Sequence, residues 1–329
     1  MKTIFQLLEE QAALYGDRTF LSCNGKEISF QSCHDMAERV AGNLVLRGIG
    51  RNDKVVLLLD NCLEFLYCFF GLGRVGAIMV PVNPTLALEE LVFIIEDSDA
   101  TAVVLTKALA PAWPKLQAAV PALKHCFVTA SEEPIENMEP FAHLLEPLDA
   151  ENTVAAAEAQ DDASIIYTSG TTGIPKGVVL THSNYFWDTL ATSRSNTMFP
   201  EDRILCLLPL FHVNAQVVSI LIPLLRGAQV FLMTGRFGPF SILPAIERHK
   251  ISIMSAVPTI YGIMCRIAST EAYNVNSMRY FVSGAAPMPE EIYNATQRLF
   301  KKPLVMGYGL TEATCASAVA DHEDPIRWN

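Results

Sequence analysis

The segment from residue 167 to residue 179, YTSGTTGIPKGVV, combines residue types that could hold a polyanion. Its glycines allow the backbone to turn N–H groups inward, and its hydroxyl side chains add further hydrogen-bond donors. Lys176 supplies a full positive charge, because the reference pKa of lysine is about 10.4. We therefore predict a phosphate-binding loop formed by Lys176 together with Thr168, Ser169, Gly170, Thr171, Thr172, Gly173 and Gly177.

The residues that follow the lysine distinguish this loop from a Walker A motif. That motif requires Gly-Lys-Ser/Thr at the start of a helix, whereas Lys176 precedes Gly177 and the strand-like segment VVLT. The pattern therefore predicts a loop between two strands. On composition alone, a flexible surface hairpin without a ligand is the alternative.

Two further glycine-rich segments, RYFVSGAAPMP and PLVMGYGLTEA, each follow a strand-like run. In open parallel sheets, ligands bind beyond the carboxyl ends of the strands. Small side chains at Gly284, Ala285 and Ala286 suit a flat ring that lies close to the backbone. Tyr308 adds an aromatic face, and the hydroxyl of Thr311 and the carboxylate of Glu312 could hold phosphate and Mg²⁺. Taken singly, each could be an ordinary turn, a core aromatic residue or a solvated charge.

The elements that must position these loops follow a regular alternation. Apolar runs such as VVLLL at 55–59 and TAVVLT at 101–106 are separated by helical patterns, which is typical of a doubly wound α/β fold with parallel sheets. Asn24-Gly25 between two strand-like runs predicts a hairpin. Residues 130–163 have a weaker pattern and predict a connection, so we expect one α/β lobe at 1–160 and a second at 161–329.

Composition limits the class of partner. The chain has 329 residues, is 50% hydrophobic and carries a net charge of −11, so a large core is expected and nucleic acid is an unfavourable ligand. The uncharged stretch 204–225 contains Pro209 and His212, which favours a strand and a core helix over membrane insertion. The negative charge therefore predicts a small-molecule partner. Eight scattered cysteines without a CxxC pair, together with no visible signal peptide, predict a cytoplasmic protein.

The motifs YTSGTTGIPKG, PLFH, SGAAP and MGYGLTE occur in this order. Together they resemble the core motifs of the adenylate-forming superfamily, which includes acyl-CoA synthetases, aryl-acid ligases, amino-acid adenylation domains and firefly luciferase. The resemblance covers essentially the whole chain. It implies two doubly wound, mostly parallel sheets covered by helices in layers αβαβα.

The resemblance also implies a role for each motif. The loop from Thr168 to Lys176 would hold the β- and γ-phosphates of ATP, and Gly284, Ala285, Ala286 and Tyr308 would frame the adenine. Thr311 would contact the α-phosphate, and Glu312 would bind Mg²⁺. His212 of PLFH would stand beside the acyl pocket as a gate, with a packed core histidine as the alternative. The three glycine-rich turns are then expected to form one nucleotide pocket.

The family's reaction couples a carboxylate to AMP, with pyrophosphate leaving, and then passes the acyl group to a thiol. Amino-acid adenylation domains generally place an aspartate just after the segment like PLFH, whereas Val213-Asn214-Ala215-Gln216 follows here. This difference predicts a small-molecule carboxylic acid without an α-amino group, such as a fatty or aryl acid. CoA is the expected thiol.

The largest departure from the family lies after MGYGLTE. Family members continue through a hinge and a small lysine-bearing domain, whereas this sequence ends at DHEDPIRWN. We therefore expect the large N-terminal domain only, with its β-barrel part incomplete, the small C-terminal lid domain absent and full turnover deficient. The alternative is a non-catalytic nucleotide- or acyl-binding module derived from such a ligase. Luciferase-like oxygenation has no distinguishing residue, and a homodimer is compatible with the sequence.

Overall fold

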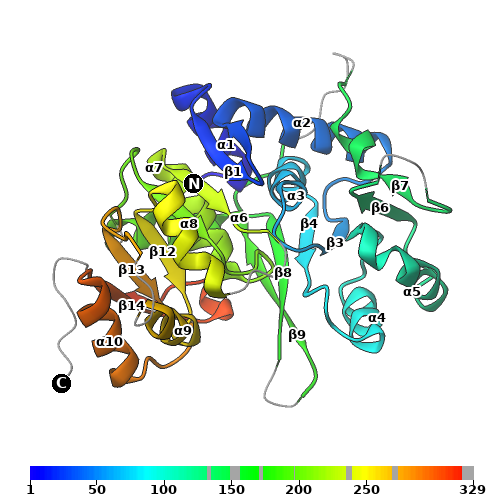
Figure 1. Cartoon of the computed structure of the whole chain (residues 1–329). Coiled ribbons are helices and arrows are strands. Elements are labelled where there is room, and N and C mark those ends of the chain that lie inside the picture. Colours follow the sequence, from blue (N-terminus) through cyan, green and yellow to red (C-terminus); the bar gives the residue numbers. More distant parts are fainter. Residues whose placement is uncertain are drawn as a thin grey trace. The chain divides into compact units, whose positions relative to one another are not determined.

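The computed structural model describes residues 1–131, 135–148, 156–169, 173–195, 197–234, 239–268 and 273–320. The chain forms two compact units, and each unit is built from three separate segments of the sequence (Figure 1). Unit 1 consists of Met1–Asp17, Phe30–Phe186 and Leu210–His212, and unit 2 consists of Arg18–Ser29, Trp187–Pro209 and Val213–Asn329. The division into α/β lobes at 1–160 and 161–329 stays a prediction.

Unit 1 contains a seven-stranded sheet in the order β7-β6-β5-β3-β4-β8-β9. β8 and β9 form an antiparallel hairpin, and the other neighbours pair in parallel. The strands are β3 (Lys54–Leu58), β4 (Ile78–Pro81), β5 (Ala102–Thr106), β6 (His125–Thr129), β7 (Glu139–Pro140), β8 (Asp162–Thr168) and β9 (Lys176–Thr181).

Helices cover this sheet on both sides, with α2 and α3 on one and α4 and α5 on the other (Figure 1). Buried side chains of β3 and β5 pack against Trp113 and Leu116 of α5, which explains why this face of the two strands is apolar. The helices are α1 (Ile4–Tyr15), α2 (Phe30–Leu46), α3 (Leu63–Val75), α4 (Leu88–Asp97) and α5 (Trp113–Ala119), with 3₁₀ turns at Lys107–Ala112 and Phe141–Leu145.

Unit 2 contains an eight-stranded sheet in the order β15-β14-β13-β12-β10-β11-β1-β2. The five strands from β14 to β11 and their neighbour β1 pair in parallel, and antiparallel β15 and β2 lie at the two edges. The strands are β1 (Thr19–Cys23), β2 (Lys26–Ser29), β10 (Arg203–Cys206), β11 (Gln229–Leu232), β12 (Ile253–Ala256), β13 (Tyr280–Ser283), β14 (Leu304–Tyr308) and β15 (Ala318–Val319). The hairpin predicted at Asn24-Gly25 is confirmed.

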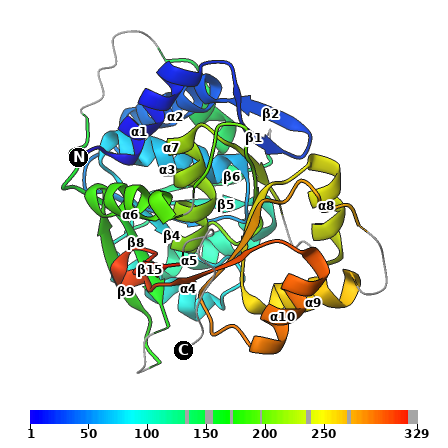
Figure 2. The ribbon, with the colours of Figure 1, turned by 90° about the vertical axis from the view of Figure 1, so that its left-hand side faces the viewer.

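The helices α9 and α10 lie side by side over β13 (Figure 2). Phe281 of β13 packs against Tyr261 of α9 and Phe300 of α10, with ring centroids 5.8 and 5.4 Å apart. The helices of this unit are α7 (Ile222–Arg226), α8 (Ile242–His249), α9 (Pro258–Ala268) and α10 (Glu290–Phe300), a π-helix at Ala215–Leu221, and 3₁₀ turns at Pro239–Ser241 and Thr311–Ala313. α6 (His182–Ser195) crosses the boundary between the two units. Two mostly parallel sheets covered by helices confirm the predicted fold class.

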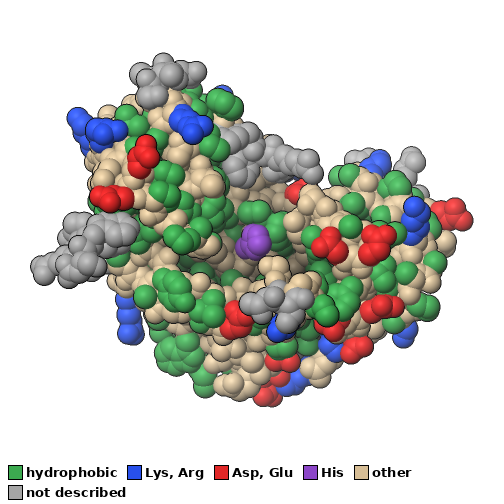
Figure 3. Space-filling model, turned by 90° about the horizontal axis from the view of Figure 1, so that it is seen from below, with side chains coloured by type: hydrophobic (Ala, Val, Ile, Leu, Met, Phe, Trp, Pro, Cys, Tyr) green, Lys and Arg blue, Asp and Glu red, His purple; other side chains and the backbone are tan. Residues whose placement is uncertain are grey.

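The apolar stretch 204–225 contains most of β10, the π-helix and most of α7. Among the residues that the structure describes, no helix is both long and apolar enough to cross a membrane. On the face shown in Figure 3, acidic and basic side chains are interspersed, and basic side chains do not gather into a large patch.

Candidate active site

The predicted phosphate loop joins β8 to β9, as its strand-like flanks indicated. Thr168 pairs with Lys176 across the hairpin, and Gly173 has a φ of +80°, a conformation that glycine adopts readily. Ser169 and Lys176 are exposed, and the side-chain ammonium of Lys176 makes no hydrogen bond or ion pair with another described residue. Gly170, Thr171 and Thr172 lie outside the described residues, so their predicted role stays a prediction.

A side-chain hydrogen bond joins the hairpin to α4. The hydroxyl of Tyr167 donates a hydrogen bond to Oδ2 of Asp97 at 2.6 Å. Desolvation and the adjacent carboxylate both raise the pKa of Tyr167, so the phenol stays protonated and remains a donor. This contact fixes the residue that precedes Thr168 at the start of the loop.

The residues predicted to frame adenine come together in unit 2. Ala285, Ala286 and Tyr308 line a cavity of about 670 Å³, with walls from Met306 to Gly309 and from Ala318 to Ala320. The cavity lies beyond the carboxyl ends of β13 and β14, where parallel sheets bind ligands. Tyr308 is 69% exposed, so one face of its ring is available for stacking. This volume is in the range of pockets that hold small ligands.

Gly284, the fourth residue predicted to frame adenine, does not line this cavity. A Cβ at Gly284 would lie 3.2 Å from the carbonyl oxygen of Gly307. The ends of β13 and β14 therefore approach each other closely at this point. Ala285 has a φ of +65°, a left-handed conformation that is uncommon for alanine. Such strain is concentrated at functional turns.

Thr311 and Glu312 occupy the 3₁₀ turn that follows β14. Glu312 is exposed and makes no hydrogen bond or ion pair with another described residue. Mg²⁺ is commonly held by one or two carboxylates together with substrate phosphates and water. The exposed carboxylate of Glu312 is of the ligand type that this ion uses, and its role as the Mg²⁺ ligand stays a prediction.

His212 lies at the end of the segment Leu210–His212, which belongs to unit 1. The segment is anchored where the backbone N–H of Leu210 donates to Oδ1 of Asn61 at 2.8 Å. The imidazole lies 4.6 Å from the ring of Phe211 and is exposed, yet desolvation lowers its pKa. A solvent-accessible ring in crowded apolar surroundings stays neutral near pH 7. Its role as a gate is not tested by this geometry and stays a prediction.

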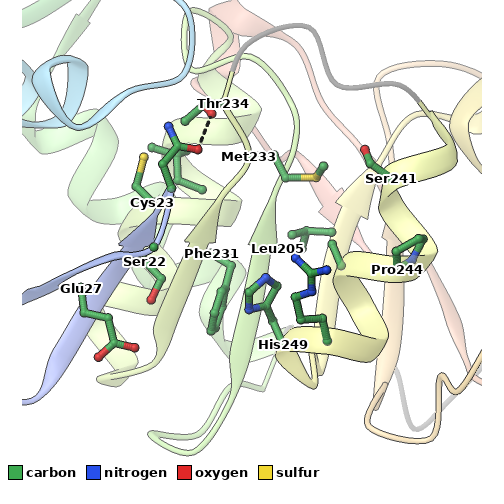
Figure 4. A pocket seen from close by; sticks show the side chains of 15 residues that line it. Ser22, Cys23, Glu27, Leu205, Phe231, Met233, Thr234, Ser241, Pro244 and His249 are labelled. Carbon is green, nitrogen blue, oxygen red and sulfur yellow. Dashed lines mark hydrogen bonds between the residues drawn. The ribbon is translucent and has the colours of Figure 1, made fainter.

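A second cavity, of about 820 Å³, lies in unit 2 between the β1–β2 hairpin, β11 and α8 (Figure 4). Phe231 and His249 face each other in it with ring centroids 4.8 Å apart. At its upper end, the hydroxyl of Thr234 donates to Oδ1 of Asn24 at 2.9 Å. None of the site residues predicted from the sequence lines this cavity.

Sequence reasoning missed Asp188, a carboxylate in the middle of α6. One of its oxygens is buried without a hydrogen-bond partner among the described residues. The sequence alone carried no clear signal, because the burial of Tyr185 and Thr192, which lie one turn to either side, is known only from the structure. A carboxylate on the buried face of a helix is rare enough to mark a special position.

The comparisons with known proteins agree with the motifs. The profile of the family described as AMP-binding enzyme matches residues 8–328. The chain therefore belongs to the AMP-binding enzyme family, and the predicted resemblance is confirmed.

Two curated relatives and one solved structure illustrate the similarity. The chain is 30% identical over 297 residues to 4-coumarate–CoA ligase 3 of Arabidopsis thaliana, an alignment that covers 88% of this chain and 52% of that protein. It is 31% identical over 305 residues to the long-chain-fatty-acid–CoA ligase FadD13 of Mycobacterium tuberculosis, covering 91% and 58%. The chain thus spans little more than half the length of these relatives.

The solved structure is that of the anthranilate CoA ligase AuaEII in complex with anthranoyl-AMP. It matches with a TM-score of 0.92 at 25% identity and covers 99% of this chain and 63% of that one. The fold described above is therefore shared by a protein whose structure contains an acyl-adenylate.

Proposed function

We propose that this chain activates a carboxylic acid with ATP and belongs to an acid–CoA ligase. The carboxylate oxygen attacks the α-phosphorus of ATP and forms the acyl-adenylate, and pyrophosphate leaves. The thiol of CoA then attacks the acyl carbon, and AMP leaves. The observation that carries the proposal is the cavity lined by Ala285, Ala286 and Tyr308 beyond two parallel strands, in a chain of the AMP-binding family.

The first step brings one anion onto another, so positive charge and oriented donors must be in place beforehand. Lys176 and the hydroxyls of Thr168 and Ser169 are assigned to the β- and γ-phosphates, and Thr311 to the α-phosphate. Glu312 is assigned to Mg²⁺, which neutralises phosphate charge when bound. The exposure of Lys176 and Glu312, without partners among the described residues, supports these roles.

The acid is proposed to lack an α-amino group. Asn214 and Gln216 follow His212 where amino-acid adenylation domains generally place an aspartate, so no carboxylate is available there to pair with a substrate amine. The names of the relatives, which include a coumarate and a long-chain fatty acid ligase, fit aryl or fatty acids. His212, neutral near pH 7, is assigned to the entrance of the acyl pocket.

We predict that Lys176→Ala and Glu312→Ala each weaken Mg-ATP binding about tenfold or more, because each removes a charge that pairs with the phosphates or their cation. A tenfold loss corresponds to about 1.4 kcal/mol. Isothermal titration calorimetry with Mg-ATP and with adenosine measures the effect. Adenosine has no phosphate, so its affinity should change less than twofold. Unchanged Mg-ATP affinity in both variants would contradict the assignment.

A further inference from the structure

The turn that carries Thr311 and Glu312 has a closed and strained backbone. Thr314 has a φ of +70°, in the left-handed region that β-branched residues rarely adopt. A Cβ at Gly309 would lie 1.6 Å from the carbonyl oxygen of Cys315, so the chain returns very close to its own start. The N–H of Ser317 donates to the carbonyl of Tyr308 at 2.9 Å and closes the loop. A strained loop of this kind persists only where its surroundings hold it.

Asp188 contacts this loop from α6. Its Oδ1 accepts a hydrogen bond from the backbone N–H of Ala316 at 3.2 Å. A weaker contact joins Nδ2 of Asn214 to Sγ of Cys315 at 3.8 Å, and the hydroxyl of Ser255 lies 3.4 Å from Oδ1 of the same asparagine. The returning arm of the loop is therefore held by polar side chains from two other segments, and Asp188 supplies the bond to its backbone.

Retaining a carboxylate at this position costs stability. Burial raises the pKa of Asp188 to about 6, although the N–H of Ala316 opposes that effect. The neighbouring ionisable group is the thiol of Cys315, whose pKa is also raised by burial, so no positive charge offsets the penalty from that side. Oδ2 is buried without a hydrogen-bond partner among the described residues, which adds a desolvation cost. Costly buried ionisable groups cluster at functional sites.

We propose that Asp188 is a positioning residue that fixes the amide of Ala316 and thereby holds Thr311 and Glu312 in the orientation that binds the phosphates of Mg-ATP. This inference rests on the proposed function of those two residues. Asp188 itself touches no substrate. It acts through the backbone, because a bond to residue 316 restrains the turn that begins at residue 311.

The test compares Asp188→Ala and Asp188→Asn with Glu201→Ala, which removes an exposed carboxylate from the same unit. Amide hydrogen exchange without nucleotide measures the loop directly, and calorimetry measures affinity for Mg-ATP and for adenosine. In Asp188→Ala, exchange at Ala316 and Ser317 should accelerate at least tenfold, and the dissociation constant for Mg-ATP should rise about tenfold. The dissociation constant for adenosine should rise less than threefold.

Asparagine retains a side-chain oxygen that can accept from Ala316, so Asp188→Asn should restore both quantities to within about threefold of the wild type. Asp188→Ser, whose hydroxyl is one bond too short for the same contact, replaces the alanine variant if that variant does not fold. Unchanged exchange at Ala316 in Asp188→Ala, or faster exchange with unchanged Mg-ATP affinity, would overturn the proposal. A wild-type chain that binds no Mg-ATP would instead refute the proposed function, and the exchange measurement separates the two failures.

Discussion

Burial shifts the pKa values of two ionisable side chains on α6, His182 and Asp188, in opposite directions. Desolvation lowers the pKa of His182 to about 4 and raises that of Asp188 to about 6. In both cases the neutral form is favoured, because a low-dielectric surrounding disfavours charge. Nδ1 of His182 faces the backbone N–H of Ile4 at 3.4 Å, and Nε2 is buried without a partner among the described residues. A neutral ring whose Nδ1 accepts from this N–H therefore ties the start of α6 to the start of α1.

The histidine makes unfolding depend on pH in a defined direction. Its folded pKa lies below the unfolded value of about 6.5, so the unfolded chain binds the proton more tightly and stability falls as pH falls. For a folded pKa of about 4, the free energy of unfolding should drop by about 2 kcal/mol between pH 7 and pH 4.5 from this group alone.

Urea unfolding of the wild type and of His182→Gln at both pH values measures this drop. Asp188 contributes with the opposite sign, since its raised pKa makes stability fall as pH rises from about 4 to about 6. Both proteins retain Asp188, so its contribution cancels in the comparison. An equal pH dependence in the two proteins would show that His182 does not titrate as inferred.

At the scale of elements, the β8–β9 hairpin is fixed to α4 by the bond between Tyr167 and Asp97. We predict that Tyr167→Phe and Asp97→Ala each lower the free energy of unfolding and that the two changes are not additive. A double-mutant cycle should give a coupling energy of about 1 kcal/mol, the usual size for one side-chain hydrogen bond. The cycle is measured by urea unfolding at pH 7. Strict additivity would mean that the contact does not restrain the hairpin.

The sequence alone was sufficient to predict those elements that depend on a local pattern of residues. Glycine-rich runs after apolar strands predicted turns after β8, β13 and β14, and Asn24-Gly25 predicted the β1–β2 hairpin. Turn residues and strand periodicity act over a few residues, so they can be read directly. The same reasoning brought Ala285, Ala286 and Tyr308 to one cavity.

Features that depend on distant partners could not be predicted in this way. β1 pairs in parallel with β11, so Leu21 lies beside Val230. The sequence of neither strand indicates which strand it pairs with. The π-helix at Ala215–Leu221 has the apolar composition of an ordinary core helix. The bond from Ala316 to Asp188 joins residues 128 positions apart, and the carboxylate is recognised as special only once its burial is known.

At the scale of the whole molecule, charge and surface agree with a small-molecule partner. The net charge of −11 repels anionic polymers, and acidic and basic side chains are interspersed on the face shown in Figure 3. ATP is itself an anion, so its phosphates need local donors such as Lys176 rather than a favourable overall field.

The central claim is that the chain couples a carboxylic acid to AMP. Isotopic exchange between pyrophosphate and ATP, measured with a panel of fatty, aryl and α-amino acids, tests it most directly because exchange requires reversible adenylate formation. We predict exchange with at least one fatty or aryl acid, none with α-amino acids, and a loss of at least tenfold in Glu312→Ala. If the chain binds Mg-ATP but shows no exchange with any acid, the ligase proposal is contradicted and a nucleotide-binding module is favoured instead.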